Sequence, residues 1–128
     1  MPKKLAANDF ERARNFIKTQ ARPVDQRLFG YHFESGPAEA VIAELSKFQN
    51  GDGGFGNGLE PDFRMKTSSP IATTVAFQYL GEVSATADEE LVRRGIGYFI
   101  SSYDTEQERW HQPGKEVNDA PHALVAIR

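Results

Sequence analysis

Residues 48–62 read FQNGDGGFGNGLEPD, and this stretch decides the fold. It places five glycines within eight residues, with Phe55 and Leu59 in and just after them. Glycine lacks a Cβ atom, so it can adopt positive φ or let another segment of backbone come close. A flexible linker would not also carry two large apolar side chains. The stretch therefore predicts a tight loop of defined shape that directly follows a helix.

A weaker copy of this pattern follows about 50 residues later. The segment from Phe99 to Trp110 again offers an apolar helix end, a polar turn and one large aromatic side chain. This spacing is typical of helical repeat arrays. Packing between hairpins is the expected role of Phe55 and Trp110, because large aromatic side chains dominate core burial. A place in the wall of a binding groove is the alternative.

The composition limits the possible functions. With 128 residues the chain can form one domain with a modest core, and the absence of cysteine excludes disulfides, thiolate metal sites and a cysteine nucleophile. The net charge of −3 with interspersed signs gives no electrostatic footprint for nucleic acid. No apolar run approaches the roughly 20 residues that a membrane span needs, and no secretory signal is visible. We therefore expect a cytoplasmic protein with no nucleic-acid partner and no membrane span.

Capping signals and apolar periodicity predict helices near residues 9–20, 37–49, 70–80 and 88–102. The start signals are two capping-box patterns and two prolines suited to a first helical position: Asn8 with Glu11, Thr86 with Glu89, Pro37, and Pro70 after Ser69. The helix over 70–80 is apolar on most sides, so it is predicted to be buried and to end at Gly81. The stretch 24–33 is not assigned, because Pro23 is interpreted as the stop of the first helix.

The last predicted helix and the C-terminal segment complete the pattern. One face of the helix over 88–102 is lined by Val92, Ile96, Phe99 and Tyr103. A polar cap followed by proline at 118–121 predicts the beginning of a further helix over 122–127. Amphipathic helices thus alternate with apolar ones, which predicts an outer amphipathic layer and an inner apolar layer.

The first repeat resembles a known superfamily. The residues QNGDGGFG at 49–56, followed by TTVAFQYLG at 73–81, are similar to the repeat of the terpenoid cyclases and protein prenyltransferases, in which an outer helix ends in Gln, a glycine-aromatic loop follows and an inner helix leads back. The resemblance covers roughly 37–122, and the segment from Tyr103 to Trp110 is a half-match. It implies an all-α fold, an α/α toroid of helical hairpins. The chain would be a single partial domain over 1–128, an incomplete ring of about two and a half hairpins with repeats near 37–81 and 88–128.

The departures from the superfamily weigh more on function than the matches do. The Asp-x-Asp-Asp acid of the cyclases is missing, and so is the cysteine that the prenyltransferases use to bind zinc. The sequence therefore favours a prenyltransferase-like or cyclase-like scaffold or binding module that is non-catalytic or truncated. An enzyme acting on an isoprenoid-like or other apolar small molecule is the alternative. A glycan-processing toroid enzyme with paired carboxylates is a third, weaker possibility.

Candidate site residues lie in the two loops that precede the inner helices. Glu60 and Asp62 come before the helix at Pro70, and Asp119 and His122 mark the start of the next. Equivalent loops of stacked hairpins lie at the same end, so these four side chains would converge near positive helix ends. Such a group would bind a divalent metal as cofactor, with Asp62 and Asp119 as candidate catalytic acids. Alternatively, Ser69 and Asp119 are N-caps, and the acids of the first loop bond only their own backbone.

The inner helix over 70–80 supplies the remaining predictions. Phe77 and Tyr79 would line a pocket for an apolar small molecule, with the candidate acids at its mouth. Because an incomplete ring leaves this helix open, we also expect self-association that covers Ile71, Val75, Phe77 or Tyr79. Exposed apolar patches of that size are rare on monomers.

Overall fold

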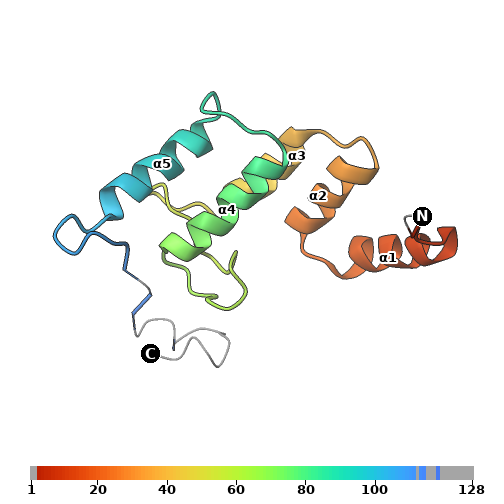
Figure 1. Cartoon of the computed structure of the whole chain (residues 1–128), viewed down its shortest axis with the longest axis horizontal. Helices are drawn as coiled ribbons and strands as arrows, with labels where there is room; N and C mark the ends of the chain where they lie inside the picture. The colour runs from red at the N-terminus through yellow and green to blue at the C-terminus, as the bar shows by residue number, and fades with distance from the viewer. Residues whose placement is uncertain (1–2, 112, 115–117, 119–128) are drawn as a thin grey trace. The chain divides into compact units, whose positions relative to one another are not determined.

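The computed structural model describes residues 3–111, 113–114 and 118, and Figure 1 shows five α-helices in that part of the chain. They are α1 (Ala7–Gln20), α2 (Pro23–Phe33), α3 (Ala38–Ser46), α4 (Pro70–Glu82) and α5 (Glu90–Ser102). The described residues contain no β-strand, so the predicted all-α class is confirmed. No helix among them is long and apolar enough to cross a membrane. The helix predicted over 122–127 lies outside the described residues.

The chain divides into two compact units, Met1–Glu44 and Leu45–Arg128. In the first unit α1 packs on α2, and the Phe10 ring stacks on the Phe29 ring with centroids 6.0 Å apart. Lys18 and Arg14 of α1 both form ion pairs with Glu34, each at 2.8 Å. The hydrogen bond from the Lys18 side chain, followed by the one from Arg14, lowers the pKa of Glu34.

The unassigned stretch 24–33 is a helix. Pro23 occupies the first turn of α2, where its missing N–H leaves no donor unsatisfied, so it starts a second helix besides ending the first. The Arg22 Nε donates to Asp25 Oδ2 at 3.1 Å across that first turn. Val24 and Phe29 are buried, which shows that packing in the first unit stabilises a segment whose glycine and aromatic residues give it little intrinsic helix propensity.

Among the predicted caps of α1, α4 and α5, the one at Ser69 forms as expected. The Ser69 Oγ accepts from Ala72 N at 3.0 Å, and Pro70 opens α4. The capping box at Asn8 is wrong, because α1 begins at Ala7, two residues before the predicted start, and its N-cap, Ala6, has no side-chain bond. The capping box at Thr86 is also wrong. Thr86 O accepts from Glu89 N in a turn that precedes α5.

Two helix ends differ from the prediction. The helix predicted over 37–49 ends at Ser46, since the N–H groups of Phe48 and Gln49 bond three residues back and tighten the last turn. α4 continues past Gly81 to Glu82. Ser84 then takes φ +56°, and Ala85 N bonds Leu80 O at 2.9 Å, which is the arrangement usually built on glycine.

In the second unit α4 and α5 pack side by side (Figure 1). α4 buries Ala72, Thr73, Ala76 and Leu80 but exposes Thr74 and Gln78, so the helix predicted to be buried all round has one buried face. α5 buries Leu91, Val92, Gly95 and Tyr98. A Cβ atom on Gly95 would lie 2.5 Å from the Phe77 ring, so glycine permits this close approach. The buried face of α5 is therefore centred on Gly95. Of the predicted apolar face, Val92 is buried, Phe99 and Tyr103 are half-buried, and Ile96 is exposed.

Candidate functional site

The glycine loop, residues 49–58, has the tight and defined shape that its sequence predicts. An antiparallel bridge joins Gln49 to Phe55, and Asn50 N bonds Gly54 O at 2.8 Å. Gly53 and Gly58 have φ of +87° and +80°, which side-chain-bearing residues rarely adopt. A Cβ atom on Gly56 would lie 2.2 Å from the backbone oxygen of Thr67. The glycines thus allow the loop to lie directly against the segment that leads into α4.

Phe55, at the centre of this loop, is completely buried. Its N–H donates to Thr73 Oγ1 at 2.9 Å, and its carbonyl accepts from Ser69 N at 3.1 Å. The Thr73 hydroxyl in turn donates to Ser69 O at 2.7 Å. Phe55 is therefore a packing residue that fixes the loop to the start of α4, as expected, and it lines no groove.

Polar side chains fasten the glycine loop to α5 as well. Gln49 Nε2 donates to Gly53 O and to Leu91 O, both at 3.0 Å. The Arg94 guanidinium donates to Gln49 Oε1 at 3.0 Å and to Asn50 O at 2.8 Å. These donors and acceptors are all used within the fold, so this part of the loop has a structural role.

The second loop, residues 103–111, closes in a similar way after α5. Asp104 and Arg109 form an antiparallel bridge, with Asp104 N bonding Arg109 O at 2.8 Å. The Asp104 carboxylate accepts from Gln107 N at 3.0 Å, and His111 Nε2 lies 2.6 Å from its Oδ2. The Gln107 backbone bond, followed by the His111 contact, lowers the pKa of Asp104. A charged carboxylate therefore organises this loop, where the first loop relies on glycines.

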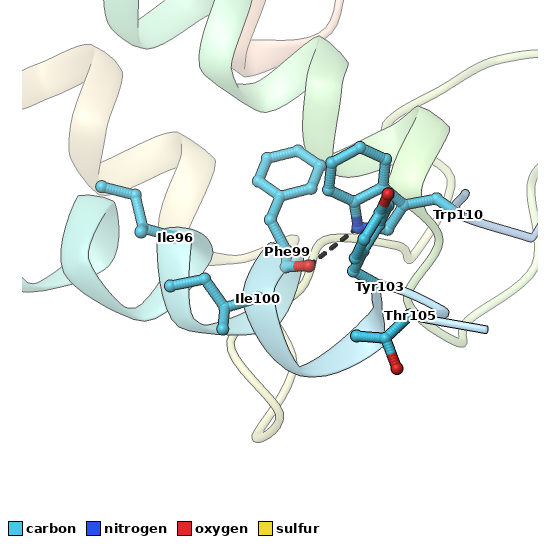
Figure 2. Close-up of a pocket in the computed structure, with 6 residues that line it drawn as sticks. All are labelled: Ile96, Phe99, Ile100, Tyr103, Thr105 and Trp110. Carbon is cyan, nitrogen blue, oxygen red and sulfur yellow. Dashed lines mark hydrogen bonds between the residues drawn. The ribbon is translucent and has the colours of Figure 1, made fainter. Parts of the chain in front are cut away.

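Trp110 is the large aromatic residue of the second loop, as Phe55 is of the first, but it directly follows the bridge residue Arg109 and remains 44% exposed. Its indole Nε1 donates to Phe99 O at 2.8 Å, as Figure 2 shows. The Trp110 ring contacts the rings of Phe99 and Tyr103, with centroids 5.9 and 4.7 Å away. The Phe99 ring also meets Phe77 of α4 at 5.5 Å. The rings of Phe77, Phe99 and Trp110 therefore form a row from the contact between α4 and α5 to the surface.

An apolar hollow of about 450 Å³ lies on this side of α5 and the second loop (Figure 2). Its lining residues are Ile96, Phe99, Ile100, Tyr103, Thr105 and Trp110. None of them carries a charge, and Ile96 and Ile100 are 42% and 73% exposed. The volume falls in the range of small-molecule sites, and the wall is suited to apolar surface. We call this surface the α5 face. Three of its residues, Ile96, Phe99 and Tyr103, belong to the apolar face that the sequence predicts for this helix.

A smaller polar hollow of about 190 Å³ lies at the start of α4. Its polar lining comes from Ser68, Ser69, Tyr98, Ser102 and His111. Burial, followed by the charge of Asp52, raises the pKa of Tyr98. The Ser68 hydroxyl already donates to Asp52 Oδ1 at 2.7 Å, and the Ser69 hydroxyl caps α4. Most of these groups have internal partners, which leaves little to hold a ligand.

The predicted acidic site is only partly within the described residues. Glu60 Oε1 accepts from Asp62 N at 2.8 Å, so Glu60 bonds its own loop, as the alternative interpretation expected. Asp62 is exposed. Asp119 and His122 lie outside the described residues, and among the described ones no group of three or more His, Asp or Glu side chains could hold a metal ion. The convergence of the four side chains remains a prediction.

The predicted ligand pocket residues on α4 are half-buried. Phe77 packs against Gly95 and Phe99, and neither Phe77 nor Tyr79 lines the apolar hollow. Ile71 and Val75 are half-buried too, and self-association through α4 remains a prediction. Among the described residues of the second unit, the exposed large apolar side chains lie on the α5 face. The signal that could have located it is the Ile96–Ile100 pair. It lies nearly half a turn away from the stripe of Leu91, Gly95 and Tyr98, so α5 has more than one apolar face.

Comparison with known proteins gives no further guide to this surface. No known protein family, curated protein or solved structure matches the chain. Its function is therefore argued from the geometry of the α5 face.

Proposed function

We propose that this chain is a non-catalytic helical-hairpin module of the terpenoid cyclase and prenyltransferase type, which binds an amphipathic helix on the α5 face. The observation that carries the proposal is the set of apolar residues left uncovered on α5. Ile96, Ile100 and Trp110 are among the most exposed large apolar side chains of the chain. They adjoin one another around a single hollow, whereas isolated apolar residues on a surface need no explanation.

The spacing of these residues indicates the kind of partner. Ile96, Phe99 and Ile100 follow one another on α5 at i, i+3 and i+4, and Tyr103 comes directly after the last helical residue. Side chains at this spacing form one ridge along a helix, and such ridges pack into the grooves of a second helix. An amphipathic helix laid against a groove uses the same arrangement of apolar anchors. A helical partner therefore fits the α5 face better than an extended peptide.

The hairpin resemblance supports the same conclusion. In an array of stacked hairpins each repeat covers the apolar side of its neighbour, so an apolar side is expected to be covered by another helix. The second loop repeats the bridge and aromatic of the glycine loop, and Trp110 is held in place on the open side. The side chains that close both loops bond within the fold, which favours a scaffold over a catalyst. A cytoplasmic location is part of this proposal.

Fluorescence of Trp110, the only tryptophan of the chain, tests the proposal directly. The probe is a synthetic amphipathic peptide of leucine and lysine with a helical pattern. Addition of this peptide should shift the emission to the blue, because the indole loses water contact. A peptide of the same composition with its pattern scrambled should have no effect.

Two variants give this titration its control. Ile100→Glu places a charge at the centre of the α5 face and should abolish the shift. Phe16→Glu changes a side chain of similar exposure, 66%, in the other unit and should leave it unchanged. An equal response from both variants, or none from the unmodified protein, would contradict the proposal.

A second candidate function is the binding of an uncharged apolar small molecule in the same hollow. Its volume of about 450 Å³ and uncharged lining favour this candidate. The indole N–H is already bonded to Phe99 O, so an apolar ligand would leave no buried donor unpaired. Titration with farnesol, an isoprenoid alcohol, against dodecanol tests it. Saturable quenching of Trp110 by farnesol alone, lost in Ile100→Glu, is the expected result for this candidate.

A further inference from the structure

A third hollow, of about 410 Å³, is formed by the glycine loop and the segment that leads into α4. We call it the loop hollow, and its lining residues are Asn50, Asp52, Lys66, Thr67 and Ser68. All five side chains are polar, and the volume falls in the range of small-molecule sites. The loop hollow shares no lining residue with the apolar hollow of the α5 face, so it is a separate surface.

The Asp52 carboxylate supplies a fixed negative charge to the loop hollow. Its Oδ1 accepts two hydrogen bonds, from Gly54 N at 2.9 Å and from the Ser68 hydroxyl at 2.7 Å. Its Oδ2 has no hydrogen-bond partner among the residues that the structure describes. The Asp52 side chain is also exposed. One oxygen therefore holds the carboxylate in place, and the other is open to a donor from outside the chain.

Lys66 supplies the opposite charge. Its backbone carbonyl is held by Asn50 Nδ2 at 2.9 Å and by Asn57 N at 3.2 Å. Within residues 3–111, its ammonium forms no ion pair, not even with Asp52, which lines the same hollow. The neighbouring Thr67 is exposed and adds a hydroxyl to the wall. A cation and an anion thus line one hollow without neutralising each other.

We infer that the loop hollow binds a small zwitterion of the amino-acid type, with its ammonium on Asp52 and its carboxylate on Lys66. An ion of one sign would pair with only one of these charges, and an uncharged ligand with neither. Hydrogen bonds between charged groups are the strong ones, and the Thr67 hydroxyl can donate to the same ligand carboxylate. Because both charges are open to water, we expect binding in about the millimolar range.

A series of amino acids that differ only in the spacing of their charges tests this site. The probes are glycine, β-alanine, γ-aminobutyrate and ε-aminocaproate, and the amide signals of nitrogen-labelled protein report binding. We expect saturable shifts at Asp52, Gly54 and Ser68, strongest for one chain length, and none along α5. Propionate and propylamine carry one charge each and should bind about tenfold more weakly, the factor expected for one charged hydrogen bond.

Two variants remove one charge each and leave the hollow in shape. Asp52→Asn keeps an oxygen that can accept both internal hydrogen bonds, and Lys66→Gln keeps the backbone carbonyl that the loop uses. Each should weaken binding of the preferred amino acid about tenfold. Asp88→Asn and Lys4→Gln remove the same charges from exposed positions outside the loop hollow. These controls should bind as the unmodified chain does.

Three results would overturn the zwitterion site. They are the absence of saturable shifts with every amino acid, equal affinity for a single-charge probe, and unchanged affinity in both Asp52→Asn and Lys66→Gln. None of them bears on the binding of a helix to the α5 face, because that binding is followed separately through Trp110. Loss of binding in Asp88→Asn or Lys4→Gln would likewise contradict the placement of the ligand in the loop hollow.

Discussion

The glycine loop and the second loop share the same elements but differ in how deeply they bury their aromatic side chain. Each follows a helix, closes through an antiparallel bridge and presents a large aromatic side chain. Phe55 is completely buried, whereas Trp110 is 44% exposed. The difference lies in the residues around the aromatic. Gly54 and Gly56 let the first loop touch the segment before α4, but the second loop has bulkier residues at the corresponding turn and stays at the surface. The loop with closely packed glycines thus buries its aromatic side chain, and the loop without them leaves it exposed.

The largest expected effect is the loss of the buried aromatic. Phe55→Ala should reduce the free energy of unfolding by about 3–5 kcal/mol, the usual cost of deleting a fully buried phenylalanine. Trp110→Ala should reduce it by only about 1 kcal/mol, because nearly half of that side chain is already in water. Urea unfolding followed by circular dichroism measures both. Equal losses would show that the two aromatics have the same role and would break the comparison.

Crowding the glycine loop should have the next largest effect. The Cβ atom of Gly56→Ala would overlap the Thr67 backbone, which cannot move as a side chain end could, so we expect a loss of about 2–3 kcal/mol in the free energy of unfolding. Gly51→Ala is the matched control, since nothing lies within 4 Å of its Cβ position. Its stability should change by less than about 1 kcal/mol. Similar results at both sites would refute the close approach.

The hydrogen bond that anchors Phe55 allows a finer test. Thr73→Val keeps the shape of the side chain but leaves the buried Phe55 N–H without its acceptor, which should cost about 1–2 kcal/mol. Thr74→Val on the same helix is the control. Its hydroxyl bonds only Pro70 O at the exposed surface, so the free energy of unfolding should change by less than about 0.5 kcal/mol. Thermal unfolding of the two variants side by side decides the point.

Acid should affect the second loop with the smallest change in overall stability. The pKa of Asp104 in the folded chain is lowered from its ordinary value of 3.8, so the carboxylate stabilises the loop above that pH. The stabilisation is lost as the pH falls through the lowered pKa. We expect a shift in Trp110 emission below about pH 3.8 that precedes loss of the helical signal, and no such separate step in Asp104→Asn. A single coincident transition in both proteins would contradict this role of Asp104.

Much of the fold could be predicted from local patterns. The helices α1, α3, α4 and α5 carry apolar periodicity, and the serine–proline pair at 69–70 marks a start that the structure reproduces. α2 was missed because a proline can end one helix or begin the next, and the sequence pattern does not distinguish the two. The burial of Val24 and Phe29 stabilises a helix that begins at Pro23. The glycine loop was predicted as tight because glycine readily adopts positive φ, as Gly53 and Gly58 do.

The α5 face could not be predicted in the same way. Periodicity shows that α5 has apolar residues on several sides, but it cannot tell which side meets α4. That choice depends on Gly95, whose missing side chain lets Phe77 approach, and this is a contact between segments far apart in the chain. Ile96 and Ile100 are consequently exposed, and no pattern in the sequence shows that they would be. Among the predicted acids, Glu60 accepts from the backbone of its own loop, and this contact depends on the conformation of the loop.

Titration with the leucine–lysine peptide, followed by Trp110 emission, tests the central claim most directly, because the α5 face should be where an amphipathic helix binds. The account predicts a saturable blue shift in the unmodified chain and in Phe16→Glu, whereas Ile100→Glu should remain folded and give no shift. A shift that survives Ile100→Glu, or one that is lost in Phe16→Glu alone, would contradict the account and place the binding surface elsewhere in the molecule.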